Sequence, residues 1–286
     1  MLIRLKFPII VTIMLVLVVL GNHFYCDSSG NASKLWPKGG RPNIVLIITD
    51  DQRWDQLSVV QSERGDDARF SFLETPNLDA LAMQGMRFRN AFVTTSICSP
   101  SRASMLTGQY VHTHGIIDNL TPFSPRPTWA TALQDAGYAT AYFGKWHHGI
   151  QKERPGFDYV ATYRGQGDYF DTKFVISESM FDPATFDTAT KGYVDDRSID
   201  FLIDYLENPQ DKPFAIVLGL KGVHEPFEPK PEHDGSYSDR ELDTAANWMA
   251  LPPWGDFPAK MPKDPLQRSF WTSILETARG VDTSVG

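Results

Sequence analysis

The chain has 286 residues, a net charge of −8 and an ordinary hydrophobic content of 42%. Its length suits one large α/β domain or two smaller domains. The negative charge argues against broad electrostatic attraction to nucleic acid or to an acidic membrane surface. If the substrate is an anion, positively charged side chains at the binding site must attract it, because the net negative charge of the chain repels it.

The N-terminus carries the pattern of an export signal. Arg4 and Lys6 precede an apolar run over residues 7–20, and this run is short for a membrane span. We expect residues 1–21 to be a signal peptide that is cleaved after export to the periplasm or the extracellular space, which leaves no stable membrane partner. An uncleaved membrane anchor is the alternative. Residues 22–40 are polar and rich in Gly, Ser and Lys, so we expect a flexible lead-in there.

Cysteine is rare in this sequence, which contains only Cys26 and Cys98. An exported protein without disulfide pairs must rely on its hydrophobic core. Chemistry at Cys98 would leave Cys26 unpaired, or removed or mobile near the terminus. Asn31 and Asn119 lie in glycosylation sequons, which matter only if the source glycosylates its proteins.

The first predicted strand is the apolar, β-branched run at residues 43–49. Such a run indicates a parallel strand that is buried on both faces. Asp50 and Asp51 follow at the strand end, where open α/β sheets bind ligands. Their hard carboxylate oxygens suit Ca²⁺ or Mg²⁺, with Gln52 as a weaker extra contact. A helix cap or a polar turn is the alternative role for this acidic pair.

Residues 75–85 have the pattern of a complete helix. Thr75 is the expected cap, Pro76 suits the first turn and Gly85 ends the helix. The alternating residues 86–92 then predict a strand.

Residues 98–108 combine a reactive cysteine, an arginine and a predicted helix N-terminus within a short segment. Ser99 is the expected helix cap and Pro100 suits the first turn. Cys98 would then lie at a helix N-terminus, which favours an anion. Arg102 follows early in the same helix and is expected to reach back toward Cys98.

Helices and strands alternate through the rest of the chain. Helices are predicted at residues 128–137 and 195–206, and strands at residues 138–143 and 213–220. A last helical stripe covers residues 270–286. This alternation predicts an α/β fold with a mainly parallel central sheet and helices on both faces.

Lys145 and His147 follow the predicted strand at residues 138–143. Extended backbone would place both side chains on one side. Lys145 could then hold an oxyanion as a point charge, and His147 could assist proton transfer. A strand end with a solvated lysine is the alternative. We assign structural roles to His148 and to His112 and His114, because hard cations disfavour imidazole.

Four of these motifs together resemble the type I sulfatase family. Residues 98–108 read C-S-P-S-R-A-S-M-L-T-G, similar to the family signature C-x-P-S-R-x-x-x-L-T-G. Residues 144–149 resemble G-K-W-H-x-G, and residues 221–227 resemble K-A-P-H-x-P-F. With the acidic pair after the first strand, the motifs follow the family's order over most of the chain after residue 41. A thiolate phosphatase loop is excluded, since it would need an arginine where Ser104 stands.

The resemblance implies an alkaline-phosphatase-like fold and a modified nucleophile. In the family a maturation enzyme oxidises the cysteine, here Cys98, to formylglycine. Asp50, Asp51 and the modified residue would bind Ca²⁺, with Mg²⁺ less suited. Arg102 would hold the modified residue in place.

The resemblance also implies sulfuric ester hydrolysis that releases inorganic sulfate from a sulfated carbohydrate or an aryl sulfate. Lys145 and His224 would bind the sulfate group, and His224 would protonate the leaving oxygen. His147 would assist the proton transfers of formylglycine. Lys221 is a weaker substrate contact, because Gly222 and its neighbour replace the family's Ala-Pro. The alternatives are a phosphate or phosphonate ester hydrolase of the same superfamily and an inactive relative that binds glycans.

We expect residues 41–286 to be the N-terminal portion of a sulfatase catalytic domain. Residues 226–265 are rich in proline and lack periodicity, so they are expected to form surface loops near the site. In the family a further strand follows the helix predicted at residues 270–286, and it ends in an Asp-Asn pair and then a second lysine. That part does not follow here. We therefore expect a truncated product that alone binds calcium weakly and turns over little.

Overall fold

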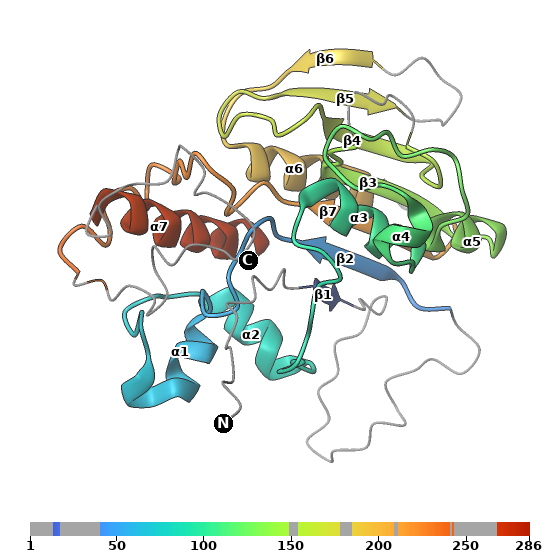
Figure 1. Ribbon diagram of the computed structural model, residues 1–286. Coiled ribbons are helices and arrows are strands. Elements are labelled where there is room, and N and C mark those ends of the chain that lie inside the picture. Colours follow the sequence, from blue (N-terminus) through green and yellow to red (C-terminus); the bar gives the residue numbers. More distant parts are fainter. Residues whose placement is uncertain are drawn as a thin grey trace, which may run out of the picture. The chain divides into compact units, whose positions relative to one another are not determined.

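A computed structural model describes two compact units of the chain (Figure 1). Unit 1 includes residues 51–93 and 222–286, and unit 2 includes residues 14–50 and 94–221. The residues described within these units are 14–17, 41–148, 154–177, 185–208, 211–240, 242 and 268–286. Each unit is considered by itself below.

Unit 2 is built on one seven-stranded sheet of order β1-β2-β7-β3-β4-β5-β6. The four central strands β2, β7, β3 and β4 run parallel to one another. The pairings of β1 with β2, β4 with β5 and β5 with β6 are antiparallel. This arrangement confirms the predicted α/β class with a mainly parallel centre. The strands are β1 (Met14–Leu17), β2 (Ile44–Ile48), β3 (Ala139–Lys145), β4 (Tyr159–Tyr163), β5 (Lys173–Ser177), β6 (Thr185–Ala189) and β7 (Phe214–Gly219).

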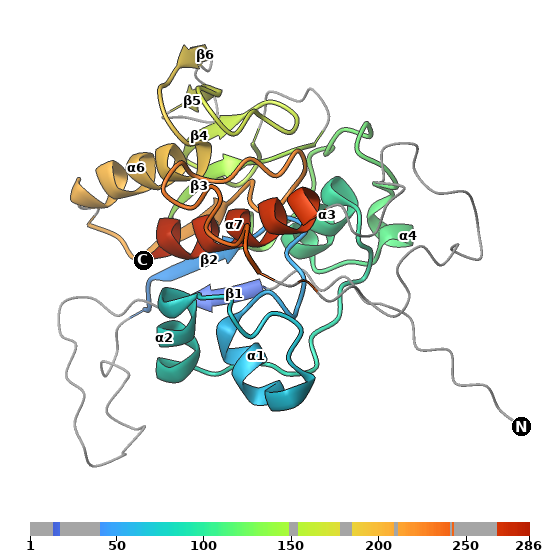
Figure 2. The ribbon, with the colours of Figure 1, turned by 90° about the vertical axis from the view of Figure 1, so that its left-hand side faces the viewer.

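Both faces of the central sheet are covered by helices. On β3, Phe143 packs its ring against Tyr205 of α6, whereas Tyr142 packs against Trp146 and Phe157. Figure 2 shows α6 on one side of the sheet and the α3–α4 pair on the other. Burial on both faces explains the continuous apolar runs in these strands. The helices of unit 2 are α3 (Cys98–Thr107), α4 (Val111–His114), α5 (Trp129–Asp135) and α6 (Val194–Glu207).

The first turns of helices α5 and α3 in unit 2 are stabilised by different hydrogen bonds. Thr128 is the first residue of the helix predicted at 128–137, and it caps α5 because its hydroxyl accepts the Thr131 backbone N–H at 3.1 Å. The prediction that Ser99 caps the next helix was wrong: α3 begins at Cys98, and the Ser99 hydroxyl donates to the carbonyl of His147. Asn119 supplies the missing acceptor, since its Oδ1 takes the Ser99 N–H at 3.0 Å.

The described residues of unit 1 form helices and loops, and none of them forms a strand. Unit 1 contains α1 (Ser58–Arg64), the 3₁₀ turn η2 (Gly65–Asp67), α2 (Pro76–Gln84) and α7 (Arg268–Val285). Helix α2 and helix α7 confirm the two helices predicted here. Thr75 does not cap α2 with its side chain, because its hydroxyl accepts the N–H of Ser58 at 2.8 Å. Instead Asp282 of α7 accepts the Leu78 N–H of α2 at 2.8 Å.

The strand predicted at residues 86–92 is wrong. These residues form a loop, and Met86, Phe88 and Phe92 are exposed. Alternation shows which way side chains would face in a strand, but a strand also needs a neighbour that accepts its backbone hydrogen bonds.

Most of the predicted leader lies outside the described residues, as do Cys26 and Asn31. The exception is residues 14–17, which form β1 and pair antiparallel with β2. Among the described residues, no helix has the length and hydrophobicity needed to cross a membrane. The described part of residues 226–265 contains neither helix nor strand, as expected, but Lys230, His233 and Tyr237 are buried rather than on the surface.

Candidate active site

Three neighbouring parallel strands of unit 2 deliver polar residues to one edge of the sheet. Strands β2, β7 and β3 lie side by side. Asp50 follows β2, Lys221 follows β7 and Lys145 is the last residue of β3. Because the carboxyl ends of parallel strands meet at one edge, this is where an α/β sheet binds its ligand.

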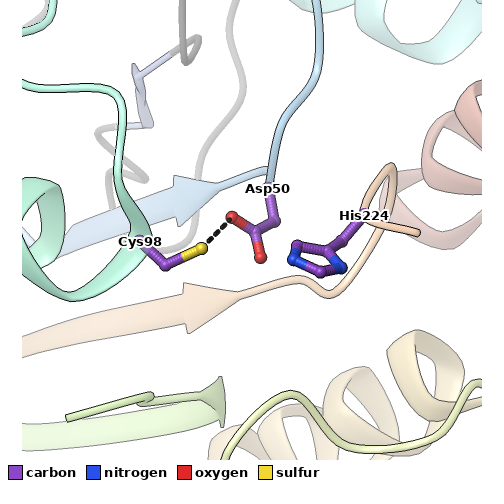
Figure 3. Close-up of side chains that lie close together, drawn as sticks. All are labelled: Asp50, Cys98 and His224. Carbon is purple, nitrogen blue, oxygen red and sulfur yellow. Dashed lines mark hydrogen bonds between the residues drawn. The ribbon is translucent and has the colours of Figure 1, made fainter. Parts of the chain in front are cut away.

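Cys98 lies at this edge beside the carboxylate of Asp50 (Figure 3), and the ammonium group of Lys145 is also close to it. Its Sγ donates to Asp50 Oδ1 at 3.7 Å, and Lys145 Nζ is 3.9 Å from Sγ. Lys145 also donates to Asp50 Oδ2. Lys145 is fully buried and Asp50 is 5% exposed. The first residue of α3 therefore presents its sulfur to a buried ion pair, where water screens charge weakly.

Arg102 fixes the backbone beneath this cluster. We expected it to reach back toward Cys98. Its hydrogen bonds run to the Lys145 carbonyl at 2.6 Å and to the Tyr142 hydroxyl at 3.2 Å. Tyr142 donates to the same carbonyl at 2.7 Å, and the guanidinium lies 3.8 Å from Asp50. Arg102 thus ties α3 to the end of β3 and adds positive charge next to Asp50.

The close approach of β3 and β7 depends on two paired glycines. Gly144 has φ of 80° and lies opposite Gly219 in the parallel register. A Cβ on Gly144 would collide with the Gly219 carbonyl, and a Cβ on Gly219 would lie 2.6 Å from the Lys145 carbonyl. Glycine is needed here so that the Lys145 carbonyl can reach Arg102.

Lys221 occupies the neighbouring strand end. Its Nζ donates to the backbone carbonyl of Gln166 at 3.2 Å and lies 4.7 Å from the centre of the Tyr169 ring. Its backbone N–H donates to Asp195 at 2.7 Å. Burial, followed by the charge of Lys145, lowers the pKa of Lys221. The structure therefore brings this weaker candidate close to Lys145.

Sequence reasoning missed Gln166, Asp195 and Asn119. The side-chain carbonyl of Gln166 accepts a hydrogen bond from Lys145. Glycines on both sides of Gln166 signalled a tight loop, but no local pattern indicated which ligand or lysine that loop would face. The same holds for Asn119, whose partner Ser99 lies 20 residues away in the sequence.

Of the two histidines after β3, His147 departs from the expected arrangement, whereas His148 is buried, which is consistent with the structural role expected of it. His147 has φ of 53°, so the extended backbone on which we based its alignment with Lys145 ends before it. His148 is fully buried with its ring 5.0 Å from those of Phe123 and Trp146. Neither of its ring nitrogens has a hydrogen-bond partner among the described residues. Burial lowers the pKa of His148 well below its usual value.

His114 is held by the helices near Cys98, consistent with a structural role. Its Nδ1 accepts the Ile116 N–H at 3.1 Å. The ring must therefore be protonated at Nε2 when neutral, and this N–H points at the Ser104 hydroxyl at 3.0 Å. His112 is exposed and stacks on Tyr110.

Unit 1 contains the other two predicted site residues, and they are neighbours within it. Asp51 is exposed and has φ of 55°. Its Oδ2 lies 3.7 Å from Nε2 of His224. The His224 Nδ1–H donates to the Glu225 carbonyl at 2.7 Å, which leaves Nε2 directed at the carboxylate.

A family model and individual relatives of known function agree on one protein family. A family model described as Sulfatase matches residues 42–286. An N-acetylglucosamine-6-O-sulfatase of Bacteroides thetaiotaomicron is 34% identical over 212 residues, which cover 72% of this chain and 35% of the relative. Arylsulfatase G of Rattus norvegicus is 42% identical over 136 residues, which cover 46% of this chain and 23% of the relative.

A solved structure extends the likeness to three dimensions. It is described as a complex with its substrate D-glucosamine-2-N,6-O-disulfate. It matches with a TM-score of 0.64 and 34% identity, over 73% of this chain and 40% of that one. The chain thus spans well under two thirds of the length of these relatives. Since the family model matches nearly all residues after the lead-in, this chain belongs to the sulfatase family.

Proposed function

We propose that this chain is a formylglycine-dependent sulfuric ester hydrolase that releases inorganic sulfate. One observation carries the proposal: Cys98, at the start of α3, has Asp50 at 3.7 Å and Lys145 at 3.9 Å. An oxygen nucleophile in place of the sulfur would lie beside a carboxylate suited to a cation and beside an ammonium group. That is the environment needed to stabilise charge that develops during attack on a sulfate ester.

The resemblance to the family supplies the chemical steps. A hydroxyl oxygen of hydrated formylglycine at position 98 gives its proton to the Asp50 carboxylate, which faces this side chain, and forms a bond to sulfur, while the bond from sulfur to the alcohol oxygen breaks. His224 gives the departing oxygen a proton. His147 then takes the proton of the second hydroxyl, so that the carbon–oxygen bond breaks and leaves sulfate and the aldehyde. Lys145 and Lys221 hold sulfate oxygens, and Arg102 keeps the backbone of Lys145 in position.

We assign Asp50 and Asp51 as the protein carboxylates of a calcium site. The donor chemistry fits, since Ca²⁺ takes oxygen ligands, and the Asp50 carboxylate is buried beside Cys98. Bound calcium would supply Lewis acidity at the nucleophile and the sulfate group. Mg²⁺ fits less well because it demands stricter octahedral geometry.

The names of two relatives support a proposal for the substrate class. One is named for N-acetylglucosamine 6-O-sulfate, and one solved structure holds a sulfated glucosamine. We propose a sulfated carbohydrate as the natural substrate, with N-acetylglucosamine 6-sulfate as the first compound to assay. The protein reaches it after export directed by residues 1–21. N-terminal sequencing of the secreted protein tests this export.

The experiment uses the full chain, expressed with and without a formylglycine-generating enzyme. Mass spectrometry of the Cys98 peptide is expected to show the aldehyde only with that enzyme. Sulfate release from an aryl sulfate is then expected to be abolished by Cys98→Ala and kept by the matched variant Cys26→Ala. Aryl phosphate and aryl phosphonate are assayed in parallel. Turnover that survives Cys98→Ala, or a clear preference for the phosphorus esters, would contradict the proposal.

A further inference from the structure

Gln166 lies between the two lysines of unit 2 and has no role in the steps above. It is the central residue of a tight loop between β4 and β5. Gly165 and Gly167 have φ of 55° and 63°. A Cβ on Gly167 would lie 2.7 Å from the ring of Tyr163, so the turn requires glycine at that position. The loop conformation thus sets where Gln166 can lie.

Each of the two carbonyl groups of Gln166 accepts a hydrogen bond from a different lysine. The side-chain oxygen accepts from Lys145 Nζ, and the backbone oxygen accepts from Lys221 Nζ at 3.2 Å. The two side chains that donate are 0% and 1% exposed. Gln166 therefore bridges the ends of β3 and β7 at the level of their charged groups.

A neutral acceptor suits this position better than a carboxylate would. An amide or peptide oxygen orients an ammonium group without cancelling its charge. A carboxylate at the same point would pair with the lysines and compete with an incoming anion. Lys145 already contacts the Asp50 carboxylate, so a second acid would neutralise the cluster further.

We propose that Gln166 is a positioning residue that holds Lys145 and Lys221 together as a paired site for a tetrahedral dianion. Its side chain directs Lys145 and its backbone directs Lys221, so that both charges converge on one anion. Under the proposed function this anion is the sulfate group of the ester or the released sulfate. Binding of inorganic sulfate itself does not require formylglycine or turnover.

The test measures binding of inorganic sulfate by calorimetry to the full, unmodified chain. Gln166→Met removes the side-chain acceptor at similar length and is expected to weaken binding about tenfold, equivalent to about 1.4 kcal/mol. Gln166→Glu is expected to weaken it further, because its charge competes with sulfate. Gln109→Met is the matched control, since Gln109 is exposed, and it should bind sulfate like the wild type.

A double-mutant cycle separates positioning from a general structural effect. If Gln166 acts through the lysine pair, Lys221→Met should lose much of its effect on sulfate binding in the Gln166→Met background. Strictly additive effects would overturn the inference. So would unchanged sulfate binding in both Gln166 variants, or a wild-type chain that binds no sulfate.

Kinetics of the formylglycine form then tests the same residue in turnover. Gln166→Met should raise KM for the aryl sulfate more than it lowers kcat, because it weakens contacts to the sulfate group. A wild-type chain that binds sulfate through these residues but hydrolyses no sulfate ester would contradict the proposed function and leave this inference standing.

Discussion

The carboxyl ends of β3 and β7 place the same residue type in two different electrostatic settings. Lys145 and Lys221 are both buried at neighbouring strand ends. Lys145 donates to the Asp50 carboxylate, whereas the side chain of Lys221 meets a peptide carbonyl and the ring of Tyr169. Lys145 offsets the negative charge of a buried carboxylate. The side chain of Lys221 instead has the two neutral contacts named above, so its positive charge is less offset and more available to an anionic ligand. Two lysines at equivalent ends of neighbouring strands can therefore have different roles. One mainly stabilises the fold, and the other mainly binds a ligand.

Replacing the two lysines should reveal this division most strongly. Lys145→Met leaves Asp50 buried beside Arg102 without its main cation, so we expect a loss of about 3–5 kcal/mol in the free energy of unfolding. Lys221→Met removes one hydrogen bond and one cation–π contact, so we expect a loss of about 1–2 kcal/mol. Urea denaturation of both variants provides the comparison. Equal losses would show that the two strand ends do not differ in this way.

The contact between the strand ends should be sensitive to a single methyl group. Gly219→Ala places a Cβ 2.6 Å from the Lys145 carbonyl and 2.9 Å from the Arg102 guanidinium. We expect a loss of about 1–3 kcal/mol from the forced shift, with sulfate binding weakened as well because Lys145 moves. Denaturation and calorimetry measure the two effects. A variant with wild-type stability and sulfate affinity would show that the close approach can relax.

The segment that follows β3 adds a pH dependence of stability. Burial keeps the pKa of His148 far below the unfolded value of about 6.5, so below that pH the unfolded chain takes up a proton that the folded chain excludes. Folding stability should therefore be insensitive to His148 above about pH 6.5 and fall by about 1.4 kcal/mol per pH unit below it. His148→Leu should flatten this fall in urea titrations at a series of pH values.

The exposed His112 provides the control for that experiment. His112→Leu makes the same substitution at an exposed histidine and so controls for the loss of a histidine as such. Equal slopes in the wild type and in His148→Leu would mean that His148 can be protonated without cost in the folded protein.

The central strands could be predicted from sequence because two-sided burial demands continuous apolar runs. Strand β2 at residues 44–48 and β7 at residues 214–219 show this directly. The outer strands β4 to β6 were missed because they mix polar with apolar residues. Their pairing is fixed by the sheet next to them, which a local pattern does not describe.

The site residues that could be predicted from the sequence are those that lie in a recognisable local motif. Asp50, Cys98 and Lys145 were expected to share chemistry, and the structure places them in contact. The side-chain partners could not be predicted in the same way. Gln166 accepts from Lys145 across 21 residues of sequence, and the alignment expected for His147 assumed an extended backbone that its φ does not have. Such contacts depend on the tertiary fold.

The bond between Asp282 and the start of α2 has a consequence for the order of synthesis. Asp282 and Leu78 are 204 residues apart, so α2 acquires this cap only after residue 282 has been translated. All strands of the described sheet of unit 2 have been translated once residue 219 has been added. We therefore expect nascent chains to protect unit 2 from protease well before unit 1, since contacts of long sequence separation form late. In the interval, the helix pair of unit 1 would be the part that most needs a chaperone. Simultaneous protection of both units on stalled ribosomes would contradict this order.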